Sequence, residues 1–421
     1  MGHKYLDMKW YCCSLLFLFT CTLSIGQEYP LSLPPALEGK IPFDFEELAS
    51  PPSFRWENQT DSVWSLIYKG GPFDGQATEV FAYYASPNTL EKDTEISGQF
   101  PGIVLIHGGG GTAFRVWALE WAKRGYAAIA MDLGGSKPAP MEEQNHLWGT
   151  KSERLSLGGP PQNDTHKFYH INAAFTEHWQ FHAISNIIGA HSLLRSFPDT
   201  SPQKTVVTGI SWGGYLTSIV AGIDHRFSAA VPVYGCGFLY EKSVWLNRFD
   251  SLGTAASQKW ERLWDPSKYV SNIKSEVLFI NGTNDFAYPV ESWQKTVDIT
   301  PNAAQLMIPQ MRHNHEYGAK PKEIAPFMNA KKDLPKISIP RQRGTRFVGT
   351  IQQSQPIQSA TLVFTKEEAP NKERKWETLP AQIKKKRIKA KVGADIKAAY
   401  FLVEYGDDLL RLSGPVWFKE D

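Results

Sequence analysis

The motif GISWGG at residues 209–214 is the clearest candidate for chemistry in the chain. It follows a β-branched run at 205–208 and leads into a segment of helical length, which is the strand–turn–helix context that a nucleophile elbow requires. In such a turn the serine points out of the sheet, and side chains at 209 and 213 would collide with neighbouring backbone. We therefore predict that Ser211 is a nucleophile for acyl transfer. The alternative role is that of a helix N-cap serine.

A second glycine-rich segment, HGGGG at residues 107–111, follows the apolar run 103–106. Acyl transfer needs N–H donors for the oxyanion, and a glycine loop after an early strand commonly supplies them. We predict that the backbone amides of Gly109, Gly110, Gly111 and Trp212 form this oxyanion hole. Nucleotide binding is disfavoured because the loop lacks a following Lys-Ser/Thr and the GxGxxG spacing.

An acid and a base follow the serine, each shortly after an apolar run. Asp285 comes in a turn after the run 277–280, and two histidines follow the run 306–308. The order serine, aspartate, histidine matches one of the known triad orders. We predict that Asp285 is the acid and that His313, the histidine nearer to the strand end, is the base. His315 remains the alternative base.

The hydrophobic pattern between about residues 101 and 330 predicts the fold that positions these residues. Short runs rich in Val, Ile and Ala alternate with segments of helical length, which is typical of a parallel sheet covered on both faces. The predicted fold class is α/β, with a doubly wound and mostly parallel sheet. The stretch 133–176 is too long for a plain connection, so we predict an insertion over the carboxyl-terminal edge of the sheet.

The motifs in this region resemble those of the α/β-hydrolase superfamily. The resemblance is strongest at residues 209–215, at 224–235 and in the loops that carry Asp285 and His313. Within the superfamily, the chain is similar to acetylxylan-esterase-like and dienelactone-hydrolase-like enzymes related to the catalytic domains of prolyl oligopeptidases. The resemblance implies a serine-hydrolase mechanism, and it leaves the acyl group open.

The amino-terminal segment has the layout of a secretory signal peptide. Two lysines precede an apolar stretch at 10–25, and small residues lead to a predicted cleavage site after Gly26. The alternative, a transmembrane anchor, is disfavoured because about 16 interrupted apolar residues fall short of the ~20 that a bilayer core needs. We predict a secreted or periplasmic protein. Of the four cysteines only Cys236 would remain after cleavage, so an intrachain disulfide is excluded.

The flanking regions differ from the core in composition. Residues 27–100 are expected to form a proline-rich lead-in followed by the first antiparallel strands. Residues 331–421 contain 19 basic and 11 acidic residues in short alternating runs, which predicts a small basic antiparallel β-domain. The run at 384–387, KKKR, is either a solvated strand face or a polyanion site.

Charge and histidine spacing narrow the choice of partners. The whole chain has 45 basic and 43 acidic residues, so its net charge is close to zero. The net charge therefore gives no indication that the chain binds nucleic acid or an anionic membrane. The pairs His166/His170 and His178/His182 have the i, i+4 spacing of metal ligands. Because they lie in an aromatic-rich region, we interpret them as packing residues. We predict no metal and no cofactor, and the oligomeric state stays open.

Three functions are consistent with these sequence features. The first is a secreted serine esterase that deacylates a carbohydrate or a similar small ester. The second is a peptidase of the prolyl-oligopeptidase kind, which is disfavoured because only about 70 residues lie between the signal segment and the core, too few for a β-propeller. The third is a non-catalytic carbohydrate-binding protein on a hydrolase fold. The predicted partner is a small-molecule or polysaccharide ester, with no nucleic acid and no integral membrane segment after signal cleavage.

Overall fold

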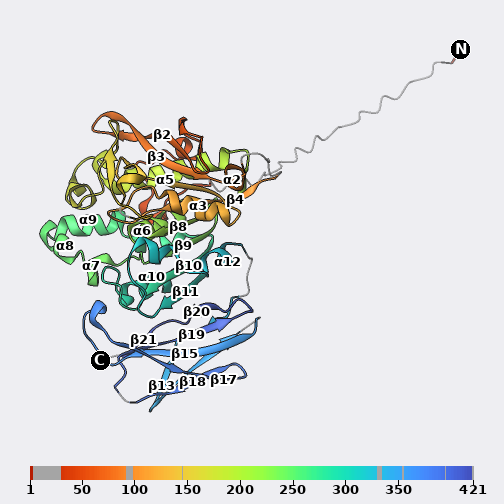
Figure 1. Cartoon of the computed structure of the whole chain (residues 1–421), viewed down its shortest axis with the longest axis vertical. Helices are drawn as coiled ribbons and strands as arrows, with labels where there is room; N and C mark the ends of the chain where they lie inside the picture. The colour runs from red at the N-terminus through yellow and green to blue at the C-terminus, as the bar shows by residue number, and fades with distance from the viewer. Residues whose placement is uncertain are drawn as a thin grey trace.

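The computed structural model describes residues 1–2, 30–91, 98–144, 146–329, 334–352, 355–393 and 395–419. Apart from its first two residues, the predicted signal peptide lies outside these ranges, with Cys12, Cys13 and Cys21, and so does the predicted domain boundary at 330/331. The described chain forms an α/β body, coloured red to cyan in Figure 1, and a smaller part built from β-strands, coloured blue.

A nine-stranded sheet lies at the centre of the α/β body, in the order β1-β2-β3-β5-β4-β8-β9-β10-β11. Its strands are β1 (Phe54–Asn58), β2 (Trp64–Phe73), β3 (Gln76–Ala85), β4 (Phe100–Ile106), β5 (Ala127–Met131), β8 (Thr200–Ile210), β9 (Phe227–Val233), β10 (Glu276–Gly282) and β11 (Ala303–Ile308). The strands from β5 to β11 in this order are parallel, and β1, β2 and β3 pair antiparallel. The predicted fold class, a mostly parallel α/β sheet, is confirmed.

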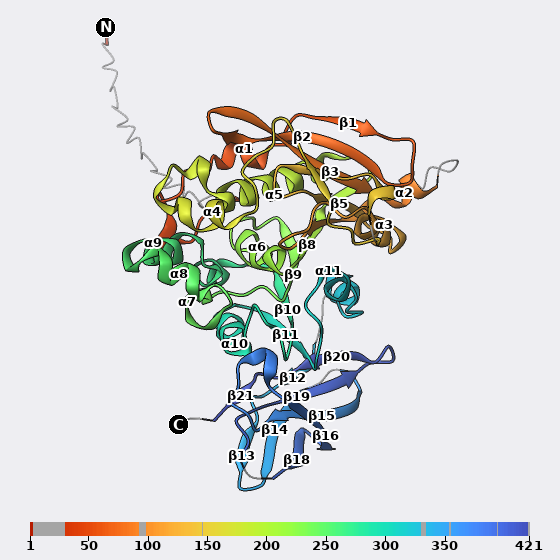
Figure 2. The ribbon, with the colours of Figure 1, turned by 60° about the vertical axis from the view of Figure 1, so that its left-hand side comes forward.

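Helices cover the sheet, and this is why its parallel strands are apolar along nearly their whole length. The helices are α1 (Phe45–Ala49), α2 (Pro87–Leu90), α3 (Arg115–Lys123), α4 (Asp164–Lys167), α5 (Trp179–Ser196), α6 (Trp212–Ala221), α7 (Leu239–Lys242), α8 (Leu246–Leu252), α9 (Thr254–Trp264), α10 (Val290–Asp298), α11 (His315–Ala319) and α12 (Ile324–Asn329). Figure 2 shows α3 on one side of the sheet and α6 and α10 on the other. Every residue of β5 is buried between the two layers. In the described ranges, no helix combines the length and the apolar composition needed to cross a bilayer.

The stretch predicted as an insertion, 133–176, contains little regular structure. It holds the two-stranded sheet of β6 (Ser136–Pro138) and β7 (Ser152–Arg154), followed by α4 and short 3₁₀ turns. The indole Nε1 of Trp179 donates to the carbonyl oxygen of Leu133 (2.7 Å) and so fixes the start of the stretch on α5.

The carboxyl-terminal part consists of two antiparallel sheets, as the alternating sequence predicts. One sheet has the order β12-β14-β18-β17 with β13 also paired to β14, and the other has the order β16-β15-β19-β20 with β21 also paired to β19. The strands are β12 (Lys336–Ile337), β13 (Arg341–Arg343), β14 (Arg346–Gln352), β15 (Ile357–Thr365), β16 (Trp376–Pro380), β17 (Gln382–Lys384), β18 (Arg387–Lys391), β19 (Ala398–Tyr405), β20 (Leu410–Ser413) and β21 (Trp417–Phe418). The second sheet packs against β11, where Ser413 Oγ accepts from the amide of Met307 (2.9 Å).

Candidate active site

Ser211 sits at the sharp turn between β8 and α6. Its backbone angles are φ 60° and ψ −118°, a combination that residues other than glycine rarely adopt. Its amide donates to the carbonyl oxygen of Val233 at the end of β9 (2.9 Å), which holds the turn in place. Strain of this kind costs about 1–3 kcal/mol and persists only where the surroundings impose it. The structure therefore has the geometry of a nucleophile elbow at the predicted position.

The glycines of the motif are required by close backbone contacts. A Cβ atom at Gly209 would lie 2.2 Å from the carbonyl oxygen of Gly213. A Cβ atom at Gly213 would lie 2.0 Å from the carbonyl oxygen of Ile106, at the end of β4. A side chain at either position would therefore collide with backbone, as the sequence predicts. Because glycine has no Cβ atom, α6 can begin close to the ends of β4 and β8.

Asp285 and His313 come together at the ends of β10 and β11. The imidazole Nδ1 of His313 lies 2.6 Å from Oδ2 of Asp285, whose side chain is buried. The other carboxylate oxygen accepts from the amides of Ala287 and Tyr288 (both 2.8 Å), so the carboxylate is fixed in orientation. The ring of His313 stacks on Tyr234, with the ring centroids 4.3 Å apart. The carboxylate can hold one imidazole tautomer and stabilise an imidazolium.

Ser211 and His313 line the same cavity, which measures about 350 Å³. Its lining also includes His315, Gly109, Trp212 and Thr150, the last from the predicted insertion. Among the described residues, no hydrogen bond links the Ser211 hydroxyl to the His313 ring. Such contacts are often long in free enzymes and tighten when substrate binds.

His315, the alternative base, also lines this cavity, but it has different hydrogen-bond partners. Its Nε2 atom accepts from the backbone amide of Gly108 (3.0 Å), and its ring packs on Phe114. Burial, together with the neighbouring His107 and His313, lowers the pKa of His315 to about 3. The ring is therefore neutral near pH 7, and it braces the start of the glycine loop.

The predicted oxyanion donors differ in whether their backbone amide already has a hydrogen-bond acceptor. Gly109 and Trp212 line the cavity beside Ser211, and their backbone amides have no hydrogen-bond acceptor among the described residues. The amide of Gly111, in contrast, donates to the carbonyl oxygen of Gly108 (3.2 Å). Gly110 has φ +69° and forms the turn between them. Gly109 and Trp212 are thus the two predicted donors with a free N–H at the cavity.

The carboxyl-terminal part reaches the loop that carries Asp285. The side-chain amide of Asn371 donates to the backbone oxygen of Asp285 (2.7 Å), and that of Asn284 donates to the backbone oxygen of Arg374 (2.7 Å). Phe286 lines one cavity with Asn371 and Arg374 and another with Ser211, and it is 54% exposed. This contact could not be predicted from the sequence, because it joins positions about ninety residues apart.

Tyr288 is a further residue that the sequence analysis missed. Its hydroxyl group is buried beside the Ser211 side chain, with which it interacts. Burial is the main cause that raises the pKa of Tyr288 well above its usual value, so the hydroxyl remains protonated. A tyrosine at this position carried no motif that could have marked it.

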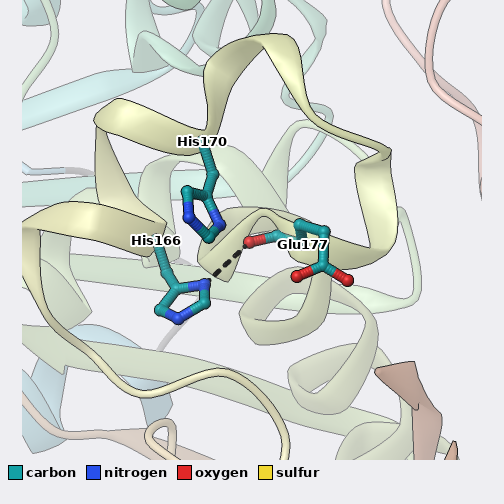
Figure 3. Close-up of side chains that lie close together, drawn as sticks. All are labelled: His166, His170 and Glu177. Atoms are coloured by element: carbon teal, nitrogen blue, oxygen red, sulfur yellow. Dashed lines mark hydrogen bonds between the residues drawn. The ribbon is translucent and has the colours of Figure 1, made fainter. Parts of the chain in front are cut away.

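Of the paired histidines, one pair meets a carboxylate. Figure 3 shows His166, His170 and Glu177, whose ligand-type atoms all lie within 4.8 Å of one another. Two imidazoles and a carboxylate form a donor set that zinc accepts. However, His166 Nδ1 lies 3.1 Å from the backbone oxygen of Glu177, and the rings of His166 and His170 pack edge to face with centroids 4.4 Å apart. These contacts also fit packing residues. That no metal binds here stays a prediction. The second pair, His178 and His182, is buried, and burial lowers the pKa of each to about 4.

Comparisons with known proteins agree with the resemblance seen in the sequence. Residues 165–326 match the model of the prolyl oligopeptidase family. An uncharacterized peptidase, YuxL of Bacillus subtilis (strain 168), is 26% identical over 275 residues, which cover 60% of this chain and 34% of that protein. The chain thus spans about a third of the length of this relative.

Solved structures show the same fold. The acetyl xylan esterase from Paenibacillus sp. R4 is 18% identical, with 67% of this chain and 90% of that chain covered and a TM-score of 0.51. Acetyl xylan esterase 1 from Thermoanaerobacterium sp. JW/SL YS485 is 17% identical, with 72% and 96% covered and a TM-score of 0.50. The resemblance to α/β-hydrolases related to prolyl oligopeptidases is confirmed, and both esterases and a peptidase are similar to this chain.

Proposed function

We propose that this chain is an exported serine hydrolase that cleaves carboxylic esters of carbohydrates, of the acetylxylan type. The observation that carries the proposal is the shared cavity: it brings the strained Ser211 next to His313, whose ring is hydrogen-bonded to the buried Asp285. Export rests on the signal-peptide pattern of residues 1–26.

The proposed reaction proceeds through an acyl-enzyme. Ser211 Oγ attacks the ester carbonyl carbon while His313 takes its proton, and Asp285 stabilises the resulting imidazolium. The amides of Gly109 and Trp212 donate to the tetrahedral oxyanion. His313 then protonates the leaving alcohol, and water hydrolyses the acyl group from Ser211 by the same steps.

The cavity beside Ser211 supports an ester of modest acyl size. It measures about 350 Å³ and is walled by Trp212, Trp245 and Phe286, which suits a small acyl group. The two acetyl xylan esterases, which match over 90% and 96% of their chains, support an ester as the substrate.

The second candidate is a serine peptidase, which the match to the prolyl oligopeptidase family favours. Acetylated xylo-oligosaccharides, feruloylated and methyl-esterified oligosaccharides and proline-containing peptide amides should be compared as substrates, with Ser211→Ala as the control. We expect acetate release with the largest kcat/KM, and its loss in the variant. A larger kcat/KM for the peptide amides would replace the esterase proposal with the peptidase one.

A further inference from the structure

The sheet β12-β14-β18-β17 has one buried face and one exposed face. Along β18, Arg387, Lys389 and Lys391 are exposed, while Ile388 and Ala390 between them are buried. Side chains alternate between the two faces of a strand, so all three cations stand on the outer face.

The pairing register extends this arrangement over the neighbouring strands. Arg346 of β14 lies opposite Lys391 and also opposite Arg343 of β13, and Lys384 of β17 lies opposite Arg387. Directly paired residues share a face. We call this surface the cationic face. It comprises the basic residues Lys336, Arg341, Arg343, Arg346, Lys384, Arg387, Lys389 and Lys391, with Val348, Thr350, Gln352 and Gln382 as its uncharged members.

Among the residues that the structure describes, no acidic side chain forms an ion pair with the cationic face. The ion pairs of residues 334–419 that the structure describes involve Lys366, Lys372, Arg374, Lys397 and Arg411, all outside the face. Like charges directly opposite one another destabilise a sheet, and ordinary solvated surfaces mix both signs. Repulsion between these cations lowers the stability of the sheet. A bound anion would offset this repulsion.

The geometry fits an extended polyanion. Alternate residues of a strand are about 6.7 Å apart and neighbouring strands about 4.8 Å apart, so the cations are spaced regularly over the face. Val348 is the one apolar member of the face and is half-buried, so no aromatic ring is available for stacking on nucleic-acid bases and no apolar side chain for insertion into a bilayer. A surface that spans β13, β14, β18 and β17 is also wider than the two-stranded ribbon that a duplex groove admits.

We infer that the cationic face binds an acidic polysaccharide, with carboxylate or sulfate groups along an extended chain. Anion binding follows from the face itself, and the choice of a polysaccharide rests on the proposed function. The sheet containing β19 and β20 lies between this face and β11, as Figure 1 shows, so a polymer bound there would leave the cavity at Ser211 open. The cationic face would then hold the polymer while Ser211 cleaves esters at other positions of the same polymer.

Binding can be measured separately from catalysis with the full-length Ser211→Ala variant, which we expect not to turn over substrate. The probe is de-esterified polygalacturonate, with neutral arabinoxylan, duplex DNA and phosphatidylserine vesicles as competitors. In the test variant, Arg387, Lys389 and Lys391 are each replaced by Gln. In the control variant, the exposed Lys123, Lys204 and Lys274 of the α/β body are replaced by Gln, which removes the same charge. A second test variant replaces Arg341, Arg343 and Arg346 by Gln.

We expect both test variants to bind polygalacturonate roughly tenfold more weakly, with a shallower salt dependence, and the control to bind as the parent does. Because like-charge repulsion is relieved, the test variants should unfold at the same or a higher temperature than the parent. Equal weakening by the control, unchanged binding in both test variants, or tighter binding to DNA or vesicles than to polygalacturonate would overturn the inference. A chain that is inactive on esters but shows the expected binding would overturn only the proposed function.

Discussion

Nδ1 of His313 lies 2.6 Å from Oδ2 of Asp285, although the two residues follow different strands and are separated by α10 and β11. The other oxygen of Asp285 accepts two backbone amides. The carboxylate is therefore fixed before any substrate arrives, and His313 has a defined tautomer.

Replacing Asp285 with Asn should remove activity without unfolding the protein. The amide oxygen of Asn can still accept the two backbone amides, but its NH₂ group would face Nδ1 and favour the wrong tautomer of His313. We expect kcat to fall by about 10³–10⁴-fold. Steady-state kinetics on an activated acetyl ester, with circular dichroism as the control for folding, would check this. A decrease of less than tenfold would show that Asp285 does not orient the base.

His313 and His315 should respond very differently to substitution. His313→Ala removes the group that we propose as the base, so kcat should fall by about 10³-fold or more. In His315→Gln the side-chain oxygen can still accept from the amide of Gly108, so kcat should fall by less than about tenfold. The reverse order of effects would make His315 the base.

The strain at Ser211 can be measured with two inactive variants. Ser211→Ala keeps a Cβ atom at φ 60°, whereas Ser211→Gly removes it. We expect the glycine variant to have the higher free energy of unfolding, by about 1 kcal/mol after its larger chain entropy is included. Chemical denaturation of the two variants side by side gives the difference. Equal stability would mean that the turn stores no strain at Ser211.

The elbow could be predicted from the sequence because its determinants are local: a strand, three glycines and a helix follow one another within ten residues. The choice between His313 and His315 could not be settled in the same way, since both follow β11 and only the distant Gly108 and Asp285 distinguish them. The cationic face shows the same limit. The run 384–387 is visible in the sequence, but its pairing with Arg346 depends on strand register. The strand β1 lies next to the prolines of the predicted lead-in, where no motif marks it.

Acid should destabilise the folded chain through its buried histidines. The side chain of His178 is buried. Burial, together with the nearby Lys259, lowers its pKa from 6.5 to about 4, and the backbone of His170 and Ala173 offsets this only in part. Below pH 6.5 the unfolded state therefore binds more protons than the folded state, so stability is present above pH 6.5 and is lost as pH falls towards 4.

His178→Phe tests this pH dependence. The phenyl ring keeps the packing on Trp264 and Phe175 but cannot take up a proton. Between pH 7 and pH 4, the variant should lose on the order of 2 kcal/mol less unfolding free energy than the parent. Urea denaturation at several pH values gives both curves. Parallel curves for the two proteins would exclude His178 as a source of acid sensitivity.

The central claim is that Ser211 carries the acyl group, and a covalent trap tests it most directly. The intact protein should be treated with a fluorophosphonate, which reacts with activated serine nucleophiles, and the adduct located by peptide mass spectrometry. We predict one adduct per chain on Ser211, its absence in Ser211→Ala, and slow labelling in His313→Ala. Labelling of Ser211→Ala at the rate of the parent, or an adduct on another residue, would contradict the account.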